Sequence, residues 1–273
     1  MNYLLIDTSY TIFYRYYATL RWYNFAHRDD VYPDDYEWFD NEIFRNMFIK
    51  KYTQSFNKII KKYKISPKNI IFIRDCKRND IWRRLFYQDY KSNRENLNGK
   101  IFKGGPFFNY VYNTIIINLV NNYGYKMLKH DNLEADDIIY LTKHYLRKLN
   151  TENKIIIISS DTDLLQLLDE NTYIYNLQNK CINNKCGNNT PKDYLEIKII
   201  CGDNSDNIPG CFNKCGQKTA LKLIKDKNLL LDKFRKNPDS LDKYTLNRIL
   251  IDLNNIPSNL VLSCDEYIQS ILT

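Results

Sequence analysis

The chain has 273 residues, a length that suits one large or two modest globular domains with a substantial buried core. Charged residues make up 26% and hydrophobic residues 44% of it, which excludes a disordered chain, and no apolar run is long enough to span a membrane. The formal net charge of +8 favours an anionic partner such as nucleic acid, although a moderately basic protein is as often merely soluble.

The N-terminal residues and the cysteines indicate the compartment. No basic region precedes the first apolar run, and Asp7 interrupts that run too early for a signal peptide. Seven cysteines, an odd number without an export signal, indicate reduced thiols. A zinc site is the alternative for Cys181, Cys186, Cys211 and Cys215, but their irregular gaps favour free thiols. We therefore expect a soluble intracellular, cytoplasmic protein with no membrane segment.

Short runs rich in Leu and Ile predict buried strands of a mainly parallel sheet. They are residues 3–6, 70–74, 154–158 and 172–175, with a further short strand at 124–128. Helical spacing lies between them at residues 43–63, at 107–122 and from 134 onward. This alternation predicts an α/β domain.

Two unusual segments follow the first strand. Residues 13–25 alternate aromatic residues with Arg15 and Arg21. Core packing explains most of the aromatic residues, and Arg15 is a candidate for a phosphate contact. Residues 29–42 are rich in Asp and Glu, and we interpret them as a solvated surface loop.

Acidic residues follow three of the predicted strands. Asp7 ends the first, Asp75 ends the second, and Asp161 and Asp163 follow the third. Because sites in open parallel sheets form beyond the carboxyl ends of the strands, we expect these acids to converge. A helix cap or a turn would explain one such acid, but hardly a repeat at three strand ends.

Three more acids open the predicted helix that begins near residue 134. Glu134 and Asp137 share one face of its first turn, and Asp136 projects about 100° away. One or two acids would complement the helix dipole, but three repel one another unless they share a cation. Hard divalent metals take oxygen ligands. Together with the strand-end acids, these residues predict a metal site.

Residues 74–103 hold nine Lys or Arg against four acids, with Trp82, Phe86, Tyr87 and Tyr90 interleaved. This pattern is typical of a surface that binds phosphates and stacks bases, with Arg83 and Arg84 among its cations. A solvated basic helix whose aromatic residues face the core explains the pattern equally well. The residues alone leave both interpretations open.

The last part of the chain begins with a predicted helix at 191–201, followed by a loop at 202–210 that contains Asp203 and Asp206. The loop composition by itself predicts only a turn. The next helix opens at Gly216-Gln217-Lys218-Thr219, which differs from a P-loop in spacing and lacks a preceding strand. Its free N–H groups beside Lys218 are suited to a backbone phosphate.

Short motifs occur in a fixed order along most of the chain: Ile6-Asp7, Arg74-Asp75, Tyr90-Lys91-Ser92-Asn93-Arg94, Leu133-Glu134-Ala135-Asp136-Asp137, Ser160-Asp161-Thr162-Asp163, and Gly202-Asp203 with Asp206-Asn207-Ile208-Pro209-Gly210. In this order they resemble the flap endonuclease and 5′→3′ exonuclease family, which includes phage 5′ nucleases, phage RNase H and the 5′-nuclease domain of bacterial DNA polymerase I. The late segment 250–257 also resembles phage relatives, and a phage or viral origin is one alternative.

The resemblance implies a PIN-like α/β fold: a mainly parallel sheet flanked by helices over residues 1–190, with a basic arch or clamp at about 76–106. It implies a C-terminal helix-three-turn-helix DNA-binding region over 191–273. It also implies two Mg²⁺ ions about 4 Å apart, for which Mn²⁺ would substitute. K⁺ at the loop after residue 202 is a further expectation.

The resemblance also assigns roles to individual residues. One metal would be held by Asp7, Asp75, Glu134 and Asp136, the other by Asp136, Asp161, Asp163 and Asp203, with outer support from Asp137 and Asp206. The catalytic residues would be Lys91, Arg94, Asp136 and Asp161. Nucleic acid would be bound by Arg15, Arg83, Arg84, Tyr90, Lys91, Arg94, Gly216, Gln217, Lys218 and Thr219.

By resemblance, the expected function is a structure-specific, metal-dependent 5′ nuclease. It would hydrolyse phosphodiester bonds at 5′ flaps, gaps or ends of DNA, and RNA primers in RNA·DNA hybrids. We expect a monomer that acts on branched or nicked DNA at sites of DNA replication and repair, alongside replication proteins. A PIN-like endoribonuclease and a non-catalytic DNA-binding protein on the same fold are the alternatives.

Three features depart from the family pattern. Tyr14 stands where an arginine is usual seven residues after the first aspartate, and Arg15 follows it. One additional residue lies between Gly210 and Gly216, which argues against the K⁺ site. Glycines at 99, 104 and 105 predict that the arch is partly loop.

Overall fold

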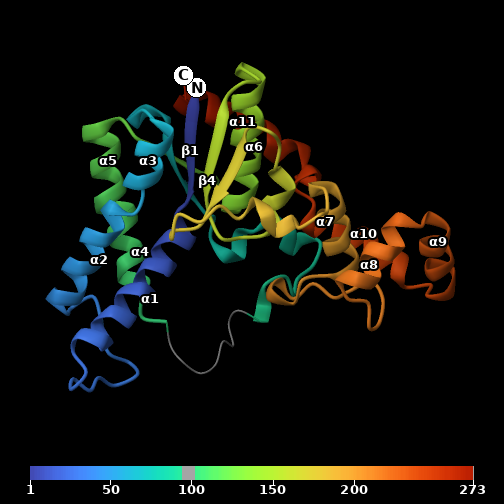
Figure 1. Cartoon of the computed structure of the whole chain (residues 1–273), viewed down its shortest axis with the longest axis horizontal. Helices are drawn as coiled ribbons and strands as arrows, with labels where there is room; N and C mark the ends of the chain where they lie inside the picture. The colour runs from blue at the N-terminus through green and yellow to red at the C-terminus, as the bar shows by residue number, and fades with distance from the viewer. Residues whose placement is uncertain (94–101, 273) are drawn as a thin grey trace.

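The computed structural model describes residues 1–93 and 102–272. At the centre of these residues lies a five-stranded sheet with the order β3-β2-β1-β4-β5 (Figure 1). The strands are β1 (Asn2–Asp7), β2 (Ile70–Arg74), β3 (Lys126–Lys129), β4 (Lys154–Ile158) and β5 (Thr172–Tyr175). All neighbouring strands are parallel. The predicted parallel sheet is therefore confirmed, including the short strand near residue 126.

Helices cover both faces of the sheet (Figure 1). They are α1 (Thr8–Ala26), α2 (Glu42–Gln54), α3 (Asn57–Tyr63), α4 (Gly105–Tyr110), α5 (Ile116–Tyr123), α6 (Ala135–Leu149), α7 (Pro191–Cys201), α8 (Gln217–Lys225), α9 (Lys227–Lys236), α10 (Ser240–Ile251) and α11 (Ser258–Leu272). Leu4 and Ile6 pack with residues of α1 to α5, whereas Leu5 packs with residues of α6 and α11. Because successive strand residues point to opposite faces, covering both faces requires strands that are apolar throughout.

In the first half of the chain, the helices differ from expectation in three places. The helix α1 was not predicted, because many of its core positions are Thr or Tyr, including Thr11, Tyr16 and Thr19, which hide the apolar period. The predicted helix at 43–63 is divided into α2 and α3. The one at 107–122 contains a π-helical turn, Val111–Ile115, between α4 and α5.

The basic segment after β2 contains two short 3-10 helices, Arg78–Asp80 and Trp82–Leu85. Trp82 and Tyr90 are 1% and 3% exposed, whereas Phe86 is 51% exposed. The interpretation that aromatic residues of this segment face the core is therefore confirmed for Trp82 and Tyr90. The expectation of a partly loop-like arch falls mainly on residues 94–101, which lie outside the described residues.

The C-terminal part of the chain leaves the sheet and returns to it. Helices α7 to α10 extend to one side, and α8 and α9 form the projecting end of the molecule (Figure 1). The last helix packs against α6, and its Cys264 and Ile268 belong to the same core as Leu5. Within the described residues, no helix is both long enough and apolar enough to cross a membrane.

Candidate metal centre

The acids that follow the strands are held by hydrogen bonds at one edge of the sheet. Asp7 is 8% exposed and caps α1, with Oδ1 3.1 Å from the Tyr10 nitrogen and Oδ2 2.8 Å from Ser159 Oγ. Asp75 Oδ1 accepts the Ala135 N–H at 2.8 Å, which ties the end of β2 to the start of α6. Asp161 Oδ1 accepts the Asp163 N–H at 2.8 Å.

The carboxylates of Asp7, Asp75, Asp136 and Asp161 lie close enough to repel one another. Burial, together with the charges of Asp75 and Asp161, raises the pKa of Asp7 to about 7. Burial and the charges of Asp161 and Asp7 raise the pKa of Asp136 well above its usual range. Carboxylates that repel one another in this way are stabilised in their ionised form by a shared cation. An all-oxygen donor set suits a hard divalent metal ion.

Glu134, at the N-terminus of α6, is buried but surrounded by positive charge. Lys91 Nζ lies 2.5 Å from Oε1, and Arg83 Nη1 lies 2.9 Å from Oε2, which also accepts the Tyr90 hydroxyl at 3.1 Å. Burial would raise the pKa of Glu134, but the charges of Lys91 and Arg83 outweigh it and lower the pKa to about 2. Glu134 is therefore an ionised oxygen donor at neutral pH.

Asp137 is fully buried, and both of its oxygens have partners. Arg83 forms a bidentate ion pair with it, at 2.7 Å and 2.8 Å, and Trp82 Nε1 donates at 3.0 Å. The Glu134 N–H donates to the same carboxylate at 3.1 Å, which completes a capping box. These contacts suit the outer, supporting role expected of Asp137.

The side chains of Arg83 and Tyr90 are buried, whereas the family resemblance implied that they contact nucleic acid. Arg83 is 3% exposed, and its guanidinium binds Glu134, Asp137 and, at 2.7 Å, the Leu250 carbonyl. Tyr90 is also buried, and its hydroxyl donates to Glu134. Both were expected to bind nucleic acid, but their side chains are enclosed because the basic segment folds onto α6 and α10.

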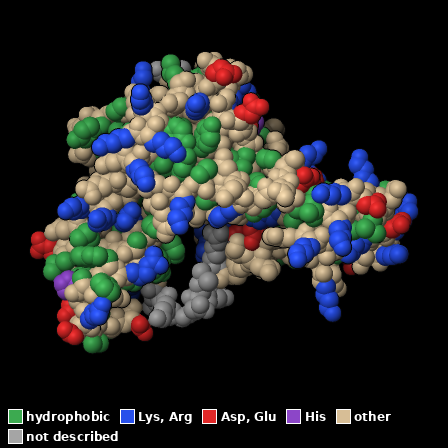
Figure 2. Space-filling model, viewed as in Figure 1, with side chains coloured by type: hydrophobic (Ala, Val, Ile, Leu, Met, Phe, Trp, Pro, Cys, Tyr) green, Lys and Arg blue, Asp and Glu red, His purple; other side chains and the backbone are tan. Residues whose placement is uncertain are grey.

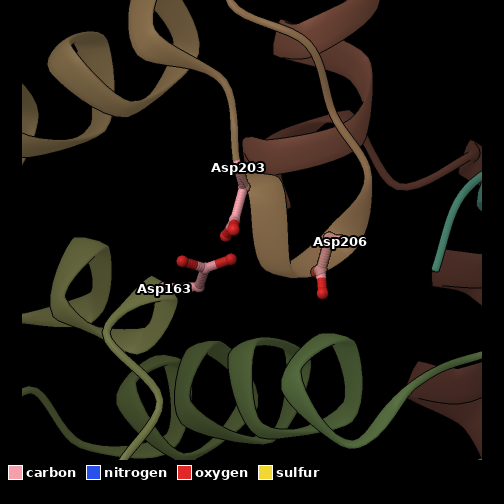
Figure 3. Close-up of side chains that lie close together, drawn as sticks. All are labelled: Asp163, Asp203 and Asp206. Atoms are coloured by element: carbon pink, nitrogen blue, oxygen red, sulfur yellow. The ribbon is translucent and has the colours of Figure 1, made fainter. Parts of the chain in front are cut away.

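A second acidic group consists of Asp163, Asp203 and Asp206, which each offer one carboxylate oxygen within 4.8 Å of those of the other two. Figure 3 shows Asp163 and Asp203 pointing toward each other, with Asp206 to one side. Asp163 follows β4, whereas the other two belong to the loop after α7. The structure thus brings the late acids to those of the sheet, and this group could hold a metal ion.

Two lysines accompany these acids. Lys198 of α7 forms ion pairs with Asp163 and, at 2.7 Å, with Asp203. Lys91 Nζ lies 3.5 Å from Asp206 Oδ2 in addition to its contact with Glu134. Burial would raise the pKa of Asp203, but Lys198 and Ser205 lower it. Sequence reasoning missed Lys198, since a lysine in the last turn of a helix ordinarily complements the dipole.

The other expected nucleic-acid contacts lie at several places. Arg15 donates to Ser55 Oγ at 2.8 Å, between α1 and α2. Arg84 lines a cavity of about 510 Å³ beside the 3-10 helices. Gly216, Gln217 and Lys218 are exposed at the start of α8, with Thr219 partly buried behind them. Arg94 lies outside the described residues.

Residues 2–194 match the family model described as the 5′-3′ exonuclease, N-terminal resolvase-like domain. The 5′-3′ exonuclease of Buchnera aphidicola subsp. Acyrthosiphon pisum is 36% identical over 173 residues, which are 61% of this chain and 55% of the relative. That of Mycoplasmopsis pulmonis is 29% identical over 229 residues, or 82% of this chain and 66% of the relative. The chain thus spans about half the length of the Buchnera relative, at 55%.

Solved structures match the whole chain. A T5 5′-exonuclease with bound zinc ions has a TM-score of 0.67 at 16% identity, covering 100% of both chains. A bacteriophage T5 flap endonuclease variant in a complex with DNA and metal ions has a TM-score of 0.68 at 16% identity, covering 100% of this chain and 99% of its own. At this identity the likeness concerns the fold, and it confirms the predicted α/β class with a central parallel sheet flanked by helices.

Proposed function

The chain belongs to the 5′-3′ exonuclease family, as its motifs predict, and we propose that it is a structure-specific, metal-dependent 5′ nuclease. Its substrates would be 5′ flaps, gaps or ends of DNA, and RNA primers in RNA·DNA hybrids. The observation that carries the proposal is the convergence of carboxylates from β1, β2, α6, the turn after β4 and the loop after α7. Phosphodiester hydrolysis by two metal ions requires such a donor set and no protein nucleophile.

Two Mg²⁺ ions would be held by these acids. One would be held by Asp7, Asp75, Glu134 and Asp136, and the other by Asp136, Asp161, Asp163 and Asp203, with Asp137 and Asp206 as outer support. When bound, the ions would activate water and stabilise charge on the leaving oxygen. Mn²⁺ would substitute for Mg²⁺, whereas K⁺ near the loop 202–216 stays a prediction.

Lys91 and Lys198 would exchange partners when substrate binds. In the protein alone their ammonium groups balance the charge of Glu134, Asp163 and Asp203. With divalent ions on these acids, the ammonium groups would be available to phosphate oxygens of the substrate. Lys91 would stabilise charge on the scissile phosphate, together with Arg94, which lies outside the described residues.

The C-terminal region would bind the duplex. Figure 2 shows many Lys and Arg side chains on the projecting part that carries α8 and α9. The sequences of α8 and α9 contain Lys218, Lys222, Lys225, Lys227, Lys233, Arg235 and Lys236. The exposed start of α8 offers backbone N–H groups beside Lys218, which suits a duplex phosphate. Residues 191–273 would form the helix-three-turn-helix region, acting as a monomer on branched or nicked DNA alongside replication proteins.

The test is cleavage of a labelled 5′-flap duplex, with Mg²⁺ or with EDTA. We expect metal-dependent cutting by the wild type and none by Asp161→Asn. Asp35→Asn is the matched control, since Asp35 is exposed in the acidic segment 29–42. Cutting in EDTA, or full activity of Asp161→Asn, would refute the mechanism. Cleavage of single-stranded RNA but not of flaps would favour an endoribonuclease.

A further inference from the structure

Arg74 is a cation at the edge of the site whose charge is not balanced by another described residue. It is the last residue of β2 and immediately precedes Asp75. Its side chain is partly buried, and within the described residues it forms no ion pair. Its guanidinium lies over the ring of Tyr112, with the guanidinium carbon 4.2 Å from the ring centroid. A cation–π contact orients a guanidinium without neutralising its charge.

Tyr112 is a fixed support beside the first acids. It is 5% exposed, and its hydroxyl shares a 3.0 Å hydrogen bond with Ser9 Oγ, two residues after Asp7. Burial raises the pKa of Tyr112, and Asp75 and Asp7 contribute to the rise, so both carboxylates lie near the phenol. Tyr112 belongs to the π-helical turn Val111–Ile115, and such turns occur frequently at functional sites.

The direction of Arg74 follows from the strand. Phe72, two residues earlier, packs with the helices on the α1 and α4 side of the sheet, so Arg74 points to that side as well. The contact with Tyr112 agrees with this direction. Arg74 therefore flanks the carboxylate group on a different side from Lys91 and Lys198, which belong to the α6 and α7 side.

Within the described residues, Lys91, Lys198 and Arg15 have partners other than Asp7 and Asp75. Lys91 and Lys198 pair with acids of α6, the turn after β4 and the late loop. Asp7 and Asp75 form no ion pair with any described residue. Arg15 of α1 donates to Ser55 Oγ.

We propose that Arg74 binds a non-bridging oxygen of a backbone phosphate that flanks the scissile bond, on the β1–β2 side of the site. This rests on the proposed function, since it takes a nucleic-acid strand as the ligand. The guanidinium fork suits phosphate geometry, and partial burial strengthens the contact. Tyr112 and Ser9 position the guanidinium, so Arg74 acts as a substrate-binding residue.

The experiment compares Arg74→Met and Arg74→Lys with the wild type on 5′-flap duplexes. Each duplex carries one neutral methylphosphonate at a different position around the cleavage site. The matched control is Arg28→Met, because Arg28 makes the same kind of contact, 4.4 Å from the Phe25 ring, on an exposed part of the chain. Affinity is measured by fluorescence anisotropy in Ca²⁺, and KM and kcat are measured in Mg²⁺.

We expect Arg74→Met to lose about ten- to a hundredfold in affinity on the unmodified duplex, the range for one charge-assisted phosphate contact. At one methylphosphonate position, the wild type should lose the same affinity and Arg74→Met should lose nothing further. Arg74→Lys should fall between the two, and Arg28→Met should match the wild type. A loss of folded protein would instead reduce the active fraction equally on every duplex.

Wild-type affinity in Arg74→Met, or equal further losses for both proteins at every position, would overturn the inference. The failure of the proposed function looks different, since the wild type would then cut no flap in Mg²⁺. The anisotropy measurement does not need turnover, so it decides the role of Arg74 in either case.

Discussion

Asp136 and Asp137 are neighbours on α6, but replacing each by Asn should change the stability of the metal-free protein in opposite directions. Asp136 is repelled by Asp161 and Asp7, whereas Asp137 is neutralised by a bidentate ion pair with Arg83. We therefore expect Asp136→Asn to stabilise the metal-free protein and to abolish cleavage. We expect Asp137→Asn to destabilise the protein and to retain part of the cleavage activity wherever it is folded.

The magnitude follows from burial. Asp137 is fully buried and Arg83 is 3% exposed, so Asp137→Asn leaves a guanidinium charge without its main partner. Breaking a buried pair from one side costs about 3–5 kcal/mol. Part of the hydrogen bonding to Trp82 and to the Glu134 N–H survives in the amide, so we expect the lower end of that range.

The assay is urea unfolding in EDTA for the wild type and the two variants, followed by flap cleavage with increasing Mg²⁺ at a temperature where all three are folded. Equal stability of Asp137→Asn and the wild type would refute the structural role of the Arg83 pair. A destabilised Asp136→Asn would refute the repulsion, and a greater loss of cleavage in folded Asp137→Asn than in Asp136→Asn would reverse the two roles.

Three further predictions concern pH, turnover and salt. Since the pKa of Asp7 is raised to about 7 in the folded protein, folded chains bind more protons than unfolded ones, and stability in EDTA should fall as pH rises from about 4 to 7. The Asp7 carboxyl alone lowers the free energy of unfolding by about 4 kcal/mol over this range. Urea unfolding should show this contribution in the wild type and not in Asp7→Asn. A wild-type stability that does not change with pH would contradict the prediction. Lys91→Ala should lower single-turnover cleavage by about 10²–10³-fold while changing duplex affinity far less, and an equal loss in both would show that Lys91 acts in binding. Duplex affinity should fall steeply with salt, and Lys218→Ala should reduce the slope of log K against log salt by about one, whereas an unchanged slope would remove Lys218 from the duplex contacts.

The sequence by itself determined the sheet and the acids at its edge. Buried parallel strands are apolar throughout, so β1, β2 and β4 are visible as runs of Leu and Ile in the chain. The acid after each run then lies at the carboxyl edge by topology alone. The order of the motifs added the family, and with it the expectation that Asp203 joins this edge.

Only the tertiary structure decided which partner each charged side chain takes. Arg83 binds Asp137 across 54 positions and the Leu250 carbonyl across 167, and no local pattern encodes those pairs. Lys198 reaches Asp163 because α7 packs against the turn after β4. Composition predicts that the segment is basic, but burial and long-range packing decide that Arg83 is paired with buried acids, whereas Arg74 forms no ion pair within the described residues.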